Sequence, residues 1–218
     1  MCQLLGMNCN VPTDICFSFE GFSARGGVTD HHSDGWGIAF FEDKGCRLFI
    51  DAKSTLESPV AELVKRYPIR SMNVIAHIRK ATQGAVALEN CHPFKRELWG
   101  RYWIFAHNGD LKNFYPKFAG PFEPVGMTDS ERAFCYVLEN LRRAFPAGQP
   151  ESEALYEKLA ALATEIGEHG EFNFLLSNGE QLYARCATNL CYIVRKADRK
   201  STRLNSSHFV PSRMPSSA

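Results

Sequence analysis

The sequence predicts an α+β fold in which antiparallel sheets carry helices on their outer faces. Strand-like apolar segments occur with hairpin turns among them, and segments of helical period stand between them in blocks. No linker and no internal repeat interrupts this pattern before residue 197. We therefore expect one domain over residues 1–197.

The first half of the chain predicts two helices and three strands. The first helix presents Ile15, Phe19 and Phe22 on one face. Thr13 or Asp14 is its expected N-cap, and Gly26-Gly27 is expected to end it. The second helix starts at Ser58-Pro59, because proline is tolerated in a first turn, and its inner face is Val60, Leu63 and Val64. The strands are residues 38–41 and 47–50, joined as a hairpin, and residues 74–79.

The second half predicts a strand at 103–107, stopped by Asn108-Gly109. Thr128 to Glu131 has capping-box spacing and opens a helix with the apolar face Phe134, Val137, Leu138, Leu141 and Phe145. A further helix carries Leu155, Leu159, Leu162 and Ile166. Residues 172–177 and 181–186 predict a hairpin with a type I′ turn at Asn178-Gly179, and residues 190–194 predict a last strand.

Composition argues against several classes of partner. Lys and Arg total 25 against 24 Asp and Glu, without a long run of either sign, so neither nucleic acid nor a membrane is expected as a partner. No apolar run approaches the roughly 18 residues of a membrane span. The N-terminus lacks the pattern of a signal peptide, so we expect a cytoplasmic protein. The eight cysteines form no C-x-x-C pair and predict neither a zinc site nor a disulfide framework.

Cys2 occupies a chemically special position. Its small side chain should allow removal of Met1, which leaves Cys2 with a free α-amine of pKa about 7.7–8. An amine next to a thiol supplies nucleophile and base in one residue, as for N-terminal threonine nucleophiles. The alternative is that Cys2 is a small apolar residue on a first strand.

Four further stretches carry chemistry, and their order along the chain is informative. They are residues 77–84 (His-Ile-Arg-Lys-Ala-Thr-Gln-Gly), 90–94 (Asn-Cys-His-Pro-Phe), 105–109 (Phe-Ala-His-Asn-Gly) and 128–131 (Thr-Asp-Ser-Glu). Together with Cys2, they resemble the class II (N-terminal nucleophile) glutamine amidotransferases, in particular the stand-alone YafJ-type group. That group shares the opening M-C-x-L-L-G-M-x-x-N-V-P-T-D-I-C-F-S-F, and the resemblance covers essentially all of residues 1–197.

The resemblance implies a four-layer αββα sandwich of the N-terminal nucleophile (Ntn) hydrolase type. It also implies hydrolysis of the glutamine side-chain amide through a thioester on Cys2, with no metal and no organic cofactor. In this reading Arg79, with Thr82 beside it, holds the α-carboxylate of the substrate. Asp129 binds the α-ammonium, while the Asn108 side chain and the Gly109 backbone N–H stabilise the oxyanion.

Each assignment has a plainer alternative. Arg79 could form a surface ion pair, Asp129 could cap a helix, and Asn108-Gly109 could be a tight turn. A Cys–His dyad is not needed beside an α-amine, so His77, His92 and His107 are expected to be structural or pocket-lining. Among the three, His92 is the first candidate to touch substrate.

Two positions stand apart from these assignments. Gln83 stands where some family members have histidine. His31-His32 with Asp34 could suggest a metal site, although a solvated turn is the expected reading.

Three functions stay open at this point. The chain could be a glutaminase that supplies ammonia to a separate synthase, or an amidohydrolase that cleaves a γ-glutamyl metabolite. It could also be a catalytically silent Ntn scaffold that binds a partner, although the intact Cys2, Arg79 and Asn108 argue against this reading.

The segment 198–218 is expected to be a non-native, disordered tail. Asp198 to His208 resembles the in-frame translation of a sequencing adapter, and residues 212–218 resemble the downstream part of the same adapter. The alternative is a natural Ser/Arg-rich disordered tail. On the adapter reading, the natural sequence is truncated at about Ala197.

Overall fold

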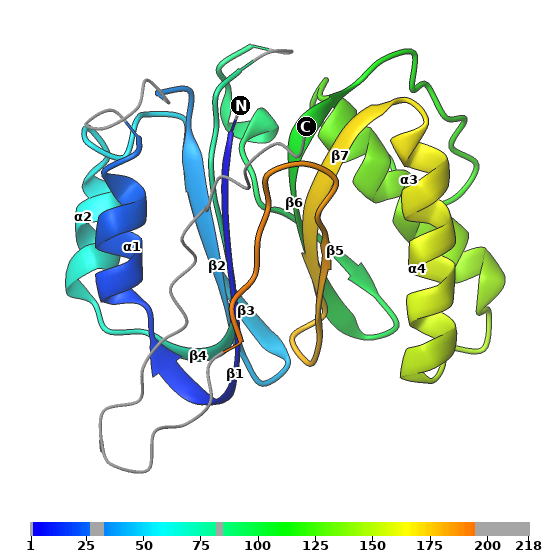
Figure 1. Ribbon diagram of the computed structural model, residues 1–218, viewed down its shortest axis with the longest axis horizontal. Coiled ribbons are helices and arrows are strands. Elements are labelled where there is room, and N and C mark those ends of the chain that lie inside the picture. The colour runs from blue at the N-terminus through cyan, green and yellow to red at the C-terminus, as the bar shows by residue number, and fades with distance from the viewer. Residues whose placement is uncertain (1, 27–32, 82–84, 195–218) are drawn as a thin grey trace, which may run out of the picture.

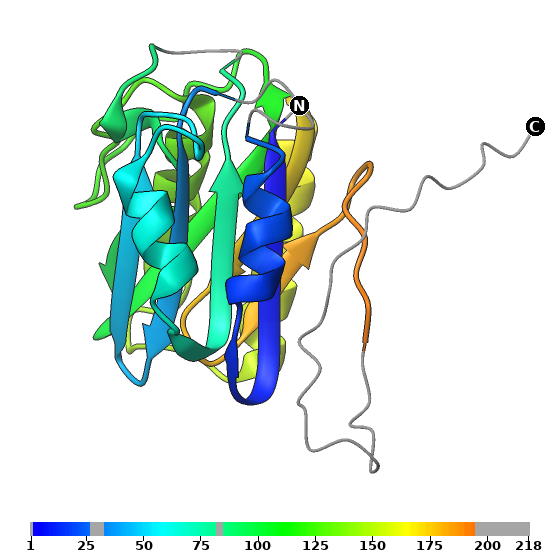
Figure 2. The same ribbon diagram turned by 90° about the vertical axis from the view of Figure 1, so that its left-hand side faces the viewer.

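Two four-stranded antiparallel sheets stack face to face between two pairs of helices (Figures 1 and 2). This computed structural model describes residues 2–26, 33–81 and 85–194. The first sheet has the order β1-β4-β2-β3, with β1 (Gln3–Asp14), β4 (Arg70–Ile78), β2 (Trp36–Glu42) and β3 (Gly45–Asp51). The second has the order β5-β6-β7-β8, with β5 (Phe94–Leu98), β6 (Arg101–Leu111), β7 (Gly170–Ser177) and β8 (Leu182–Arg185).

The helices lie on the outer faces of the sheets (Figure 1). The first sheet is covered by α1 (Cys16–Ser23) and α2 (Pro59–Arg66), and the second by α3 (Asp129–Ala144) and α4 (Ser152–Gly167). A 3₁₀ turn, Leu88–Asn90, precedes β5. The predicted α+β class and the αββα order of layers are therefore confirmed.

Alternation along the strands explains why there are three apolar layers. On β6, Phe105 packs in the core under α3 and α4, whereas its neighbours Ile104 and Ala106 pack between the two sheets. On β4, Ala76 faces α1 and α2, while Ile75 faces the second sheet. Since successive side chains of a strand point to opposite faces, each central strand buries both of its faces.

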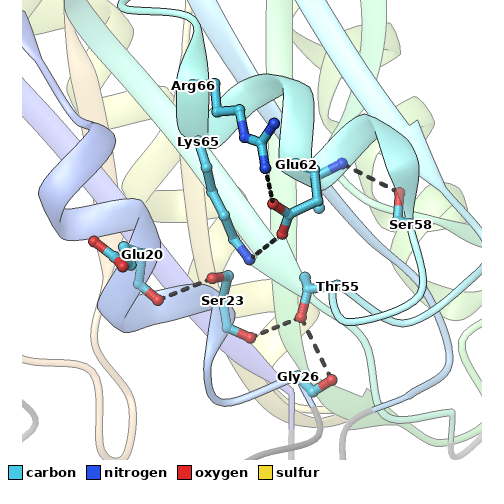
Figure 3. A network of polar contacts seen from close by, with 9 residues as sticks. Glu20, Ser23, Gly26, Thr55, Ser58, Glu62, Lys65 and Arg66 are labelled. Atoms are coloured by element: carbon cyan, nitrogen blue, oxygen red, sulfur yellow. Dashed lines mark hydrogen bonds and ion pairs between the residues drawn. The ribbon is translucent and has the colours of Figure 1, made fainter.

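The layer over the first sheet is joined by a polar network (Figure 3). The Thr55 hydroxyl donates to the Ser23 carbonyl at 2.7 Å and so fixes the end of α1 against the segment that leads into α2. Ser58 caps α2 by accepting from the Ala61 N–H at 3.3 Å. Glu62 pairs with Lys65 at 2.8 Å along the exposed side of α2.

Several predicted boundaries in the first half were wrong. Thr13 and Asp14 belong to β1, because that strand resumes its pairing with β4 after an irregularity between Asn8 and Thr13. The N-cap of α1 is Ile15, which makes no side-chain capping bond, and the helix ends at Ser23, before Gly26. Leu63, predicted on the inner face of α2, is 54% exposed, whereas Val64 is buried as predicted and Ala61 is buried with it.

In the second half, strand pairing overrides the local turn signals. β6 continues through Asn108-Gly109 to Leu111, since β7 pairs with it as far as Gly170. Residues 178–181 form a four-residue loop in place of the predicted two-residue type I′ turn. β5 was not predicted, and residues 190–194 form no strand.

The remaining predicted elements are confirmed. β2 and β3 form the expected hairpin, with Asp43 at φ 50° in its turn. Thr128 is the N-cap of α3 and accepts from the Glu131 N–H at 3.2 Å. The helix bearing Leu155, Leu159, Leu162 and Ile166 is α4. Within the described ranges, no helix is long and apolar enough to cross a membrane.

Candidate active site

The candidate site lies where β1 begins, at the upper rim of the sandwich in Figure 1. Cys2 immediately precedes β1 and lies half-buried beside the backbone that follows β4. Its Sγ accepts from the Lys80 N–H at 3.2 Å and donates to the Lys80 carbonyl at 3.4 Å. The thiol is therefore held by the main chain next to Arg79.

The surroundings of Cys2 set the protonation of its thiol. Burial raises the pKa of Cys2 above its ordinary value, while the Lys80 N–H and the positive charge of Arg79 lower it. The negative charge of Asp129 raises this pKa again. Because burial is the largest effect, the Cys2 thiol carries its proton at neutral pH and needs a base to become a nucleophile.

Arg79 brings a buried positive charge to the site. The residue directly follows β4 and is only 3% exposed, which excludes the surface ion pair considered from the sequence. Its Nη1 donates to the carbonyl oxygens of Ala85, at 3.1 Å, and Asp34, at 3.4 Å. A guanidinium has five donors in a planar fork, which suits a carboxylate.

Asn108 connects the second sheet to Cys2. Its Nδ2 donates to the Cys2 carbonyl at 2.8 Å, and its own carbonyl accepts from the Asn173 side chain at 3.1 Å. The Asn108 side-chain amide has two N–H donors, and its bond to Cys2 uses one of them. Gly109 follows in β6, where a Cβ would lie 1.8 Å from the Glu171 carbonyl oxygen, so only glycine fits between the strands.

Asp129 brings a buried negative charge from α3, the helix that packs on the same sheet as Asn108. It is the first residue of α3 and 7% exposed, and Thr128, not Asp129, is the helix cap. Its Oδ2 accepts from the Leu111 N–H at 2.8 Å, which ties the start of α3 to the end of β6. Its Oδ1 accepts from the Ser130 N–H at 2.8 Å.

The three histidines His77, His92 and His107 are buried and lie close to one another. The His77 and His92 rings pack with centroids 4.1 Å apart and are tilted by 34°, and His92 packs on Phe94 at 4.5 Å. His77 Nε2 lies 3.1 Å from the His107 carbonyl and so bridges the two sheets. His107 Nδ1 lies 2.8 Å from the Ser130 hydroxyl. Burial, with the charges of neighbouring groups, lowers the pKa of His92 well below its ordinary value.

The structure thus brings together Cys2, Arg79, Asn108, Gly109 and Asp129, five of the six predicted site residues. Thr82, together with Gln83 and the His31-His32 pair, lies outside the described residues. Sequence reasoning assigned no role to the Lys80 backbone or to the Asn90 side chain. The place of Asn90 at the start of the Asn-Cys-His-Pro-Phe stretch, residues 90–94, was the available signal.

No metal centre emerges from the described ranges, which hold no group of three or more His, Cys, Asp or Glu side chains arranged to bind an ion. Asp34, the described member of the proposed His-Asp turn, instead accepts from the Ala81 N–H at 2.8 Å. It thereby supports the segment that follows Arg79.

Comparisons with known proteins show the family to which the chain belongs. The sequence profile of the class-II glutamine amidotransferases matches residues 1–210. A candidate glutamine amidotransferase of Haemophilus influenzae is 57% identical over 198 residues, which cover 90% of this chain and 67% of the relative. The candidate glutamine amidotransferase YafJ of Escherichia coli is 54% identical over 197 residues, covering 90% of this chain and 77% of the relative.

Solved structures give the same result. The crystal structure of a predicted glutamine amidotransferase from Pseudomonas aeruginosa superposes with a TM-score of 0.72 at 42% identity, over 96% of this chain and 85% of that one. An allosteric regulatory enzyme of purine biosynthesis shares the fold, with a TM-score of 0.60 at 16% identity, over 87% of this chain and 38% of that one.

The fold is an αββα sandwich of the Ntn-hydrolase type, as predicted from the resemblance. The chain belongs to the class II glutamine amidotransferase family.

Proposed function

We propose that the chain hydrolyses the side-chain amide of glutamine, or the γ-glutamyl bond of a small metabolite, through a thioester on Cys2. The observation that supports this most directly is the bond from Asn108 Nδ2 to the Cys2 carbonyl at 2.8 Å. It places a neutral hydrogen-bond donor of one sheet beside the candidate nucleophile of the other. Buried charges of opposite sign, Arg79 and Asp129, act on the same thiol.

Those two charges suit the head group of an α-amino acid. Arg79 would bind the α-carboxylate, with Thr82 assisting, and Asp129 would bind the α-ammonium. Such a clamp would fix the α-amino-acid end of the substrate and so position its side-chain amide for reaction. Binding energy from this non-reacting end then serves to orient the amide for attack.

The chemical steps follow from the protonated state of the thiol. After removal of Met1, the α-amine of Cys2 takes the thiol proton as sulfur bonds to the substrate carbonyl carbon. The carbonyl oxygen becomes negative, and the Asn108 amide and the Gly109 N–H stabilise it. The C–N bond breaks as the ammonium returns its proton to the leaving amine. Water then attacks the thioester and releases the acid with the thiol.

Substrate choice separates the candidate functions. Purified protein that begins at Cys2 should release glutamate from L-glutamine or from a member of a panel of γ-glutamyl compounds. Cys2→Ser should abolish this release, since a hydroxyl is far harder to ionise than a thiol. Activity on glutamine only after a synthase is added would select the ammonia-supplying role. If no compound releases glutamate, the remaining candidate function is the catalytically silent scaffold that binds a partner.

The clamp has its own test in the same assay. Arg79→Lys should raise KM sharply, because a point charge cannot replace a bidentate contact. Arg101→Lys is the matched control, since Arg101 pairs with Glu180 on the partly exposed surface. Equal KM values for the two variants would contradict the assignment of Arg79.

We further propose that residues 1–197 form the catalytic domain and that 198–218 are a non-native tail. The two bacterial relatives match over 198 and 197 residues, in support of this division, while the family profile extends to residue 210. Removal of residues 198–218 should leave both kcat and the melting temperature unchanged. A lower kcat or a lower melting temperature after this removal would count against the division.

A further inference from the structure

Asn90 is a buried amide that links two loops of the site without contacting the nucleophile in any described bond. It ends the 3₁₀ turn Leu88–Asn90 and is 3% exposed. Its Nδ2 donates to the Ala85 carbonyl at 3.0 Å, and its Oδ1 accepts from the Met127 N–H at 3.1 Å. One side chain therefore holds segments that are about forty residues apart in sequence.

The first of these segments, at Ala85, bonds directly to the Arg79 side chain. The Ala85 carbonyl accepts from Arg79 Nη1 at 3.1 Å as well as from Asn90. A carbonyl oxygen has two lone pairs, so it can accept both bonds at once. Displacement of Ala85 would therefore change the position of the guanidinium.

The second segment leads directly into Asp129. Met127 precedes the N-cap Thr128, and Asp129 is the next residue along. Gly126 approaches so closely that a Cβ there would lie 2.4 Å from Asn90 Oδ1. From the other side, Glu131 accepts from the Gly126 N–H at 2.7 Å. Asn90 and Glu131 therefore both hold the segment that leads to Asp129.

We propose that Asn90 is a positioning residue that sets the separation between Arg79 and Asp129. This inference rests on the proposed function, in which those two residues bind the substrate's α-carboxylate and α-ammonium. A single carbon joins the two groups in an α-amino acid, so their binding partners must keep a fixed spacing. Productive sites hold such geometry to about 0.5 Å, which a buried amide bonded at both ends can supply.

The proposal predicts selectivity for ligands that carry both charges. A ligand with both groups must satisfy Arg79 and Asp129 together, and this requires the spacing that Asn90 sets. Glutaramate, which lacks the α-ammonium, engages only the arginine and has no spacing to satisfy. Loss of Asn90 should therefore weaken L-glutamine binding much more than glutaramate binding.

Asn178 provides a matched control for loss of a buried asparagine. It is 2% exposed, and its Oδ1 accepts from the Glu180 and Gln181 N–H groups at 3.1 and 3.0 Å in the loop between β7 and β8. It has the same chemistry at the other end of the second sheet. Replacement there removes structural bonds without touching the clamp.

The test measures ligand binding by calorimetry in a Cys2→Ala background, so that no turnover interferes. Asn90→Ala should weaken L-glutamine binding about tenfold or more, the effect expected for unsatisfied buried polar groups. Glutaramate binding should change by less than about twofold. Asn90→Asp, which keeps the acceptor and the shape but loses the donor, should show the same preference if Asn90→Ala folds poorly. In the Cys2-containing enzyme the loss should appear in KM, with kcat nearly unchanged.

A double variant tests whether Asn90 acts through Arg79. The combined loss in Arg79→Lys/Asn90→Ala should be smaller than the sum of the two single losses. Equal weakening of both ligands, or an equal effect of Asn178→Ala, would overturn the positioning role alone. Failure of the parent to bind L-glutamine and to hydrolyse any γ-glutamyl compound would overturn the proposed function together with it.

Discussion

The two Asn-Gly pairs of this chain lie toward opposite ends of the second sheet and do different things. Asn108-Gly109 lies inside β6, where the Asn108 amide reaches across the sandwich to the Cys2 carbonyl. Asn178-Gly179 lies in the loop after β7, where the Asn178 oxygen accepts from two N–H groups of its own loop. The second pair also has distant partners, since Asn178 Nδ2 donates to Gln149 at 3.3 Å and the Gly179 carbonyl accepts from Asn73 Nδ2 at 2.7 Å. The first pair differs in that it bonds to Cys2.

The two glycines differ in the same way. Gly109 is required because the Glu171 carbonyl approaches it from the neighbouring strand. Gly179 is required because its φ of 90° lies in the left-handed region, which residues with a Cβ rarely adopt. The first glycine thus allows two neighbouring strands to approach closely, and the second allows the backbone to turn. The same substitution should therefore have different consequences at the two sites.

The largest expected effect is on turnover, at Asn108. Asn108→Ala should lower kcat by about 10²–10³-fold, the usual loss when one oxyanion donor is removed. KM should change little, because the negative charge appears only in the transition state. Steady-state kinetics on the best substrate decide the matter. A tenfold rise in KM with unchanged kcat would assign Asn108 to substrate binding instead.

The second effect is on folding, at Gly109. An added methyl group must displace the Glu171 backbone or the His107 ring, whose Nε2 would lie 2.6 Å from the new Cβ. Gly109→Ala should therefore lower the free energy of unfolding by about 1–3 kcal/mol. Urea denaturation with Gly179→Ala as the comparison measures this. If Gly109→Ala is as stable as the parent, the strands are not as close as described.

The third effect is a pH dependence confined to the Asn108 end. Burial lowers the pKa of both His92 and His107, so the folded protein keeps these rings neutral in a range where the unfolded chain protonates them. The unfolded state then binds more protons, and stability should fall as pH drops below about 6.5 toward the folded pKa values. The slope is at most about 1.4 kcal/mol per pH unit for each histidine. Unfolding curves at several pH values should show a shallower slope for His92→Phe, and an unchanged slope would contradict this origin.

The smallest effect is expected at Asn178. Asn178→Ala removes three hydrogen bonds, two within its loop and one to Gln149, and should cost about 1–3 kcal/mol of stability at most, without any change in kcat or KM. Thermal unfolding and kinetics on the same preparation measure both. A loss of turnover in a folded Asn178→Ala variant would remove the distinction between the two pairs.

Local sequence signals account for much of the fold. The β2–β3 hairpin and helices α3 and α4 follow from turn residues, a capping box and helical periodicity. Those signals fail where partners distant in sequence decide the structure. β6 passes through Asn108-Gly109 because β7 pairs with it, and the apolar residues 190–194 form no strand although their composition favours one.

The site was predictable only through the resemblance. Cys2, Arg79, Asn108 and Asp129 are far apart in sequence, and no periodic pattern indicates that they meet. Asn90 shows the limit most clearly, because its role depends on bonds to Ala85 and Met127 on two different loops. A polar residue in a loop gives no local sign of such a position.

The central claim is that the α-amine of Cys2 is the base for its own protonated thiol. It is tested by one variant that keeps the thiol and extends the chain before Cys2 with a residue that cannot be cleaved. The amine then becomes an amide, which cannot accept a proton. Turnover should fall by about 10²–10⁴-fold, the range for loss of general-base catalysis. A blocked variant as active as the protein that begins at Cys2 would contradict the mechanism.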